Sequence, residues 1–251
     1  MFNNVKNLLR KIILYSPYKI VEFVLADLFS LLYLRPIKKS FSQTGEDVLI
    51  DKYLNGFKGI YVDVGANDPH RFSNTKRFYL RGWNGINIEP NPINYQRFRV
   101  DRARDTNINC GIGTIKGMMT FYIMFPDTLS TFSKKKRDEL VSQGYAYEKK
   151  IKIPIVPLST ILDTYCRNKN ISFFSIDTEG YDTVVLKSNN WKKYRPRIIC
   201  IESNNQQGAK KKTDKKNEIF LKKQGYIPIA YTAVNDIYID KSFILGINSL
   251  R

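Results

Sequence analysis

The 251-residue chain is poor in histidine and cysteine, with one histidine, His70, and three cysteines. So few ligands exclude a zinc site built from a cluster of cysteines and histidines. The cysteines, Cys110, Cys166 and Cys200, are odd in number and widely spaced, and two of them lie in apolar runs. We therefore expect reduced thiols in the core of a cytoplasmic protein rather than a set of disulfide bonds.

Acidic residues are scarce relative to basic ones. The chain has 23 Asp and Glu against 41 Lys and Arg, which gives a formal net charge of +18. Such a charge favours nucleic acid, an anionic membrane surface or a negatively charged substrate as partner, and charge alone does not choose among them. The length suits one α/β domain with an appendage and excludes two full catalytic domains.

An apolar run long enough to span a membrane is missing from the N-terminal region. Lys19, Glu22 and Asp27 interrupt the apolar windows, and no small-residue cleavage site follows a clean apolar run as in a signal peptide. Apolar residues instead recur at helical spacing between basic ones. We expect an N-terminal amphipathic helical segment, residues 1–37, that packs on the domain or forms a homodimer interface. A peripheral contact with an anionic membrane is the alternative.

The chain also lacks the Gly-x-Gly-x-x-Gly fingerprint of dinucleotide-binding folds. Residues 59–67 are GIYVDVGAN, an apolar strand that ends in Asp63 and the single glycine Gly65. A second apolar run, 85–88, ends in Glu89. When a nucleoside binds across the carboxyl ends of parallel strands, a carboxylate in this position accepts hydrogen bonds from its ribose. Because no glycine-rich cradle for a pyrophosphate is present, we expect S-adenosylmethionine rather than NAD.

Further strand ends carry polar groups to the same edge of a doubly wound sheet. Residues 171–176 lead to Asp177 and Glu179, and residues 198–201 lead to Glu202. Two carboxylates at a strand tip are costly unless they are paired, hydrogen-bonded or used. Residues 107–113 predict a third strand that runs into a glycine turn, where such domains commonly meet the base of the nucleoside.

Four motifs together resemble the FkbM family of S-adenosylmethionine-dependent methyltransferases. They are residues 42–47 (SQTGED), 62–70 (VDVGANDPH), 85–90 (GINIEP) and 176–182 (IDTEGYD). The resemblance covers about residues 40–205. It implies that residues 38–251 form a Rossmann-like class I methyltransferase domain of the α/β class, with a mostly parallel seven-stranded sheet and an antiparallel edge. The N-terminal helices expected from the apolar spacing fall outside the resemblance.

The resemblance also implies O-methylation, frequently on sugars of bacterial surface polysaccharides or on natural products. Where many relatives have a glycine two positions after the motif asparagine, this chain has Asp68-Pro69, so the amino acid end of the cofactor is expected to be held differently. The residues expected to bind the cofactor are Gln43, Asp63, Gly65, Asn67, Glu89, Pro90, Asn109, Cys110 and Asp177. The residues expected to meet the acceptor are His70, Arg71, Thr75, Glu179 and Glu202.

Methyl transfer from a sulfonium requires an aligned acceptor oxygen and the removal of its proton. His70 is one candidate base, because histidine titrates near neutral pH. Asp177 is the other, because it lies at the sheet edge beside the expected methyl position. A divalent cation held by Asp177 and Glu202 is a third option, since it would lower the pKa of a sugar hydroxyl.

The positive charge favours an anionic sugar acceptor, such as a nucleotide-activated sugar or a capsule or O-antigen precursor, met by Arg71, Arg77 and residues 134–137. The competing function is an RNA methyltransferase; no RNA-binding module is recognisable, and we expect no nucleic-acid partner. A non-catalytic membrane-associated scaffold is the third alternative, and the intact acidic motif residues argue against it. We expect a cytoplasmic protein, with the inner face of the membrane as the alternative location.

Overall fold

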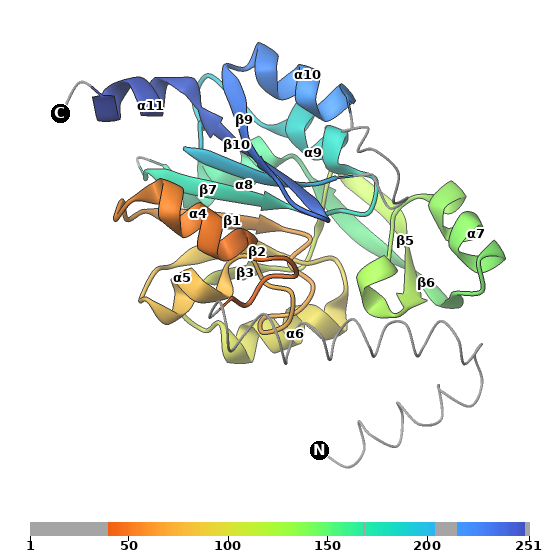
Figure 1. The fold of residues 1–251 in the computed structure, drawn as a ribbon. Helices are drawn as coiled ribbons and strands as arrows, with labels where there is room; N and C mark the ends of the chain where they lie inside the picture. The colour runs from red at the N-terminus through yellow and green to blue at the C-terminus, as the bar shows by residue number, and fades with distance from the viewer. Residues whose placement is uncertain (1–39, 168, 204–214, 249–251) are drawn as a thin grey trace.

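The structure, a computed structural model, describes residues 40–167, 169–203 and 215–248 (Figure 1). The predicted amphipathic segment, residues 1–37, therefore lies outside the described residues. Among the residues that are described, none belongs to a helix with the length and apolar character of a membrane span.

Within these residues, seven strands form the main sheet, in the order β3-β2-β1-β7-β8-β10-β9. The strands are β1 (Ile60–Val64), β2 (Gly85–Ile88), β3 (Thr106–Ile108), β7 (Ile171–Ile176), β8 (Ile198–Glu202), β9 (Tyr226–Tyr231) and β10 (Asn235–Asp240). Strands β3, β2, β1, β7 and β8 are parallel, whereas β10 runs antiparallel to both of its neighbours. The predicted α/β fold with a mostly parallel sheet and an antiparallel edge is confirmed.

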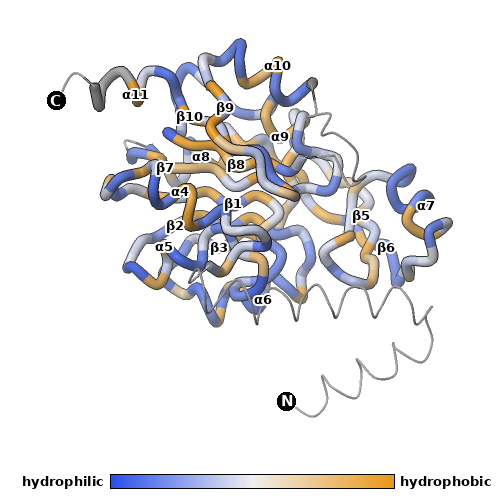
Figure 2. The backbone as a smooth tube through the Cα atoms, viewed as in Figure 1, coloured by the Kyte–Doolittle hydropathy of each residue, from blue (hydrophilic) through white to orange (hydrophobic). Residues whose placement is uncertain are grey.

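Helices cover both faces of this sheet. They are α4 (Glu46–Leu54), α5 (Lys76–Leu80), α6 (Pro92–Asp101), α8 (Leu158–Tyr165), α9 (Asp182–Ser188), α10 (Lys215–Lys223) and α11 (Lys241–Asn248). Residues of α8, α9 and α10 share one core cluster with Val62, and residues of α4 and α5 share another with Tyr61. Because alternate residues of a strand face opposite sides, β1 supplies both clusters. Figure 2 shows the apolar residues gathered in these central strands.

The three cysteines lie in the core, as predicted. Cys110 and Cys166 belong to the cluster under α8, Cys200 belongs to the other, and all three are buried and free. Burial raises the pKa of Cys110 to about 12. These thiols therefore pack as small apolar side chains.

A smaller sheet beside the main one carries a helix that the sequence did not predict. It consists of β4 (Gly111–Ile112), β6 (Ala146–Val156) and β5 (Gly117–Phe125), with the short 3-10 helix η2 (Asp127–Leu129) and α7 (Lys134–Ser142) beside it (Figure 1). The sequence pattern of residues 125–147 predicts a long loop. Helix α7 forms there because the Ser133 hydroxyl accepts a hydrogen bond from the backbone N–H of Lys136 at 3.2 Å, which caps the first turn.

The C-terminal residues also differ from the prediction. The apolar pattern of residues 243–246 predicts a strand, whereas these residues lie in helix α11. Asp240 Oδ1 accepts hydrogen bonds from the backbone N–H and the hydroxyl of Ser242, at 2.9 and 2.8 Å. This aspartate cap satisfies the first turn and starts a helix where the apolar pattern alone indicated a strand.

Candidate active site

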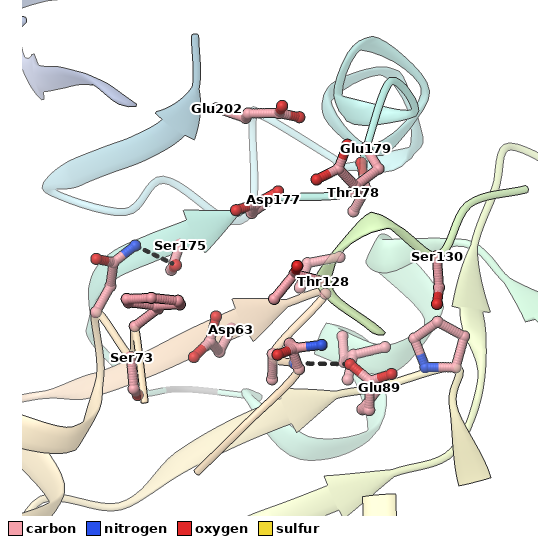
Figure 3. Close-up of a pocket in the computed structure, with 18 of the residues that line it drawn as sticks. Asp63, Ser73, Glu89, Thr128, Ser130, Ser175, Asp177, Thr178, Glu179 and Glu202 are labelled. Carbon is pink, nitrogen blue, oxygen red and sulfur yellow. Dashed lines mark hydrogen bonds between the residues drawn. The ribbon is translucent and has the colours of Figure 1, made fainter. Parts of the chain in front are cut away.

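The candidate site is a cleft at the carboxyl ends of the parallel strands. Chain order runs outward from β1 through β2 in one direction and from β7 through β8 in the other, so the topology switches between β1 and β7. Ligands of open α/β sheets bind at this switch point. A cleft of about 250 Å³ lies there, and its walls come from the tips of β1, β2, β7 and β8 and from the loop after β5 (Figure 3).

The turn after β1 brings the backbone close to the tip of β7. Gly65 has a φ of +78°, and a Cβ at this position would lie 1.8 Å from the carbonyl oxygen of Asp177. The backbone N–H of Asp177 donates to the carbonyl of Val64 at 3.0 Å, and the N–H of Gly65 donates to that of Ile88 at 3.0 Å. Only glycine combines the left-handed conformation with this contact.

Glu89, at the tip of β2, is buried and holds two turns together. Its Oε2 accepts the backbone N–H of Asn67 at 2.7 Å, and its Oε1 accepts that of Asn91 at 2.7 Å. Burial raises the pKa of Glu89 to about 8, against the lowering effect of the two N–H donors. Each carboxylate oxygen has a second acceptor site, so Glu89 can still receive hydrogen bonds from a diol.

Asp63 is buried at the end of β1. The Thr75 hydroxyl donates to Asp63 Oδ2 at 2.8 Å, and burial raises the pKa of Asp63 to about 6. On β7 the neighbour of Asp63 is Ser175, whose hydroxyl accepts a hydrogen bond from Asn74 at 3.2 Å. The loop after β1 is thus fastened to both strands that bound the cleft.

Three more carboxylates gather at the other end of the cleft. One oxygen each from Asp177, Glu179 and Glu202 lies within 4.8 Å of the other two. Although Asp177 is exposed to the cleft, the surrounding protein, and next the negative charge of Glu179, raise the pKa of Asp177 well above its ordinary value. Burial raises the pKa of Glu179 to about 7, and burial followed by the charge of Asp177 raises that of Glu202 to about 10.

The SQTGED motif of residues 42–47 forms a network of buried hydrogen bonds beside the cleft. The Asp47 carboxylate accepts hydrogen bonds from the hydroxyls of Ser40 and Ser42, at 2.5 and 3.0 Å. Glu46 accepts the hydroxyl of Thr232 at 2.6 Å, which joins the start of α4 to the hairpin of β9 and β10. Within this motif, Gln43 lies on the lining of the cleft.

Most of the predicted site residues meet in this one cleft. Its lining includes Gln43, Asp63, Gly65, Asn67, Arg71, Glu89, Pro90, Cys110, Asp177, Glu179 and Glu202. Thr75 and Asn109 stand behind the lining: Thr75 holds Asp63, and Asn109 Nδ2 donates to the backbone carbonyls of Glu89 and Pro90, at 2.8 and 3.1 Å.

His70 lies outside the lining of the cleft. Its Nε2 is 3.0 Å from the carboxylate of Asp101, its Nδ1 is 2.6 Å from Nζ of Lys76, and about half of its side chain is exposed. Asp177, and not His70, therefore lies on the lining of the cleft. A catalytic role for His70 stays a prediction without a contact to support it.

One wall of the cleft could not be predicted from the sequence. This wall comes from η2 and the residues after it, which include Thr128, Leu129, Ser130 and Phe132. Asp127 fastens it, because its carboxylate accepts hydrogen bonds from Asn94 at 3.0 Å and Arg71 at 3.4 Å. The only local hint was the turn-forming pair Pro126-Asp127, which does not indicate a ligand.

The residues of the cleft fit S-adenosylmethionine. Gly65 allows close approach of the backbone, Glu89 has acceptor sites for a ribose diol, and Asp63 offers a carboxylate for an ammonium group. Apolar side chains that can contact an adenine, among them Ile112 and Phe132, line the same cleft.

Comparison with known proteins agrees with this geometry. The family model of the methyltransferase FkbM domain matches residues 63–228. No curated protein matches the chain.

Solved structures with a similar fold are remote in sequence. A proposed caffeoyl-CoA O-methyltransferase from Staphylococcus aureus has 11% identity and a TM-score of 0.45, over 94% of this chain and 99% of that one. The precorrin-6y C5,15-methyltransferase of Geobacter metallireducens GS-15 has 12% identity and a TM-score of 0.38, over 81% of this chain and 90% of that one. At such scores neither structure contributes to the assignment of an acceptor.

Proposed function

Because the chain belongs to the FkbM family of methyltransferases, we propose that it transfers a methyl group from S-adenosylmethionine to a hydroxyl oxygen of a sugar. Methyl transfer follows from the family. The oxygen acceptor and the sugar are the proposal. The acceptor we favour is anionic, a nucleotide-activated sugar or a precursor of a surface polysaccharide such as capsule or O-antigen.

The observation that carries this proposal is the placement of carboxylates at both ends of one cleft. Glu89 stands at the tip of β2, and Asp177, Glu179 and Glu202 gather across the switch point (Figure 3). Glu89 suits the ribose of a nucleoside. The acidic end can accept several hydrogen bonds from a polyhydroxylated acceptor, which supports a sugar.

Asp177 is the carboxylate best placed to receive the proton of the acceptor. It follows β7 directly and is exposed to the cleft. The protein around it and the charge of Glu179 raise its pKa, so its ionised form is a stronger proton acceptor than an ordinary aspartate. When bound, S-adenosylmethionine supplies an already activated methyl group. The protein has to align the acceptor oxygen and hold its departing proton.

Basic side chains near the cleft support an anionic acceptor. Arg71 lines the cleft, and Lys136, in the first turn of α7, lies 3.7 Å from the carboxylate of Glu179. The exposed Lys134 and Lys135 extend this basic patch, and the chain as a whole has a net charge of +18. A phosphate group on the acceptor would be attracted to this side of the cleft.

A methyl-transfer screen tests the proposal. The full chain is incubated with S-adenosylmethionine carrying a labelled methyl group and with a panel of nucleotide sugars, the matching neutral sugars and RNA. We expect label on a nucleotide sugar, located on oxygen by mass spectrometry, and none with Glu89→Ala. Label in RNA only, or on carbon or nitrogen of the product, would overturn it.

A further inference from the structure

Three carboxylates from two neighbouring strand ends form a compact cluster. Asp177 and Glu179 follow β7, and Glu202 ends β8. One oxygen from each lies within 4.8 Å of the other two, and Figure 3 shows the three side chains together at one end of the cleft. Asp177 is exposed to the cleft, and Glu179 is half-buried.

Glu202 distinguishes this cluster from a group of exposed carboxylates, because Glu202 is buried. Its side chain is only 8% exposed, and among the described residues nothing donates a hydrogen bond to its Oε2. A buried carboxylate without a partner is costly, and it is retained when a cation or a donor completes it. The unpartnered oxygen belongs to the carboxylate that faces Asp177 and Glu179.

The positive charge next to the cluster does not balance it. Lys136 Nζ lies 3.7 Å from Glu179 Oε2, so among the residues that the structure describes one ammonium group lies beside three carboxylates. A single ammonium offers one charge and three donors in a flexible arrangement. A divalent cation would bind all three carboxylates at once.

We propose that Asp177, Glu179 and Glu202 hold a divalent cation, Mg²⁺, Mn²⁺ or Ca²⁺. These hard cations prefer carboxylate oxygens and complete their coordination with water or with ligand oxygens. The site offers oxygen ligands alone, so it disfavours the softer zinc and copper ions. The exposed side of Asp177 leaves room for water or an acceptor oxygen on the cation.

The catalytic use of the cation, though not its binding, rests on the proposed function. A hydroxyl of the acceptor bound to the cation would lose its proton more easily, because the metal stabilises the alkoxide. The proton would pass to the oxygen of Asp177 that does not bind the cation. The cation would also compete with Lys136 for Glu179. Lys136, on α7, would then be released toward an anionic group of the acceptor.

Manganese binding tests the proposal without cofactor or acceptor. The full chain is titrated with Mn²⁺, and free Mn²⁺ is followed by its electron paramagnetic resonance signal. We expect one saturable site per chain, displaced by Mg²⁺ or Ca²⁺. Glu202→Gln should weaken binding at least tenfold, whereas Glu139→Gln, an exposed carboxylate on α7, should leave it unchanged. Lys136→Met should strengthen binding several-fold, because it removes the competing charge.

Two results would overturn the site: no saturable binding of Mn²⁺ to the wild-type chain, or equal binding by Glu202→Gln and the wild type. Asp177→Asn serves as the second variant, since its exposed side chain is not part of the packed core, and it should also weaken binding at least tenfold. Circular dichroism confirms that each variant is folded. The Mn²⁺ titration needs no methyl transfer. Its result therefore stands even if the chain does not methylate a sugar.

Discussion

The carboxylate of Glu89 accepts the backbone N–H of Asn67 at 2.7 Å, and this bond joins the tip of β2 to the turn after β1. The other oxygen of Glu89 accepts the N–H of Asn91 at the same distance, at the start of α6. Glu89 therefore shapes the cofactor end of the cleft and also offers acceptor sites in it. This double role leads to two predictions.

Glu89→Gln should weaken the binding of S-adenosylmethionine by about 10- to 100-fold. The NH₂ of the amide would face one of the two backbone donors and would leave that N–H without an acceptor. Leaving a buried hydrogen-bonding group unsatisfied costs about 1–3 kcal/mol, which gives this range. Isothermal titration calorimetry measures the affinity, with Glu139→Gln as the control of equal chemistry on an exposed site. Unchanged affinity would remove Glu89 from the cofactor site.

The stability of the cofactor-free protein should depend on pH through the same residue. Burial raises the pKa of Glu89 from 4.5 to about 8, and Asp63 and Asp127 are the charges that face it. The folded protein thus holds this proton more tightly than the unfolded chain. The proton on Glu89 therefore stabilises the folded state fully below about pH 4.5. This stabilisation is lost as the pH rises to about 8, and the stability contributed by Glu89 no longer changes at higher pH.

Urea unfolding at a series of pH values measures this contribution. Other carboxyl groups titrate in the same range, so the informative quantity is the difference between the wild type and Glu89→Gln. We expect the free energy of unfolding of the wild type to fall relative to the variant between about pH 4.5 and 8. Parallel curves for the two proteins would contradict the raised pKa.

The sequence could predict the sheet and the carboxylates at its edge for one physical reason. Strands buried on both faces are nearly continuous apolar runs, and each run here ends in a polar residue at the carboxyl edge. Once the strands are parallel, Asp63, Glu89, Asp177 and Glu202 must lie at one edge. Their convergence on one cleft then follows from the topology rather than from any single motif.

The far wall of the cleft could not be predicted in this way. Helix α7 begins with the basic residues 134–137, whose charges oppose the helix dipole, and its cap at Ser133 is a single side chain. The loop that holds Thr128 and Phe132 has no periodic pattern. The direction of the His70 side chain was equally hidden, because Asp101, a residue of α6, fixes it from outside the motif.

Gly65→Ala should destabilise the protein far more than alanine at another left-handed glycine. The new Cβ would lie 1.8 Å from the carbonyl oxygen of Asp177, so β1 and β7 would have to separate. Gly82 is the matched control, because its φ is +82° and a Cβ there meets nothing within 4 Å. Left-handed strain costs roughly 1–2 kcal/mol.

We therefore expect Gly82→Ala to lower the free energy of unfolding by about 1–2 kcal/mol, and Gly65→Ala to lower it by more than about 4 kcal/mol. Urea unfolding followed by tryptophan fluorescence measures both. Equal losses would mean that the turn relaxes around the new methyl group, and that close contact between the strand tips is not what requires glycine at position 65.

The two candidate bases can be separated because they lie in different surroundings. Asp177 is exposed to the cleft at the tip of β7, whereas the ring of His70 contacts Asp101 and Lys76 outside the lining. General base catalysis contributes about 10²- to 10⁴-fold. Asp177→Asn should therefore lower kcat at least about 100-fold, with S-adenosylmethionine binding as the check that the site is intact.

His70→Gln, which can still hydrogen-bond to Asp101, should change kcat less than about threefold, because a residue outside the cleft cannot reach the acceptor proton. A loss in His70→Gln as large as that in Asp177→Asn would assign the proton to the histidine and require the loop of residues 68–75 to move when the acceptor binds.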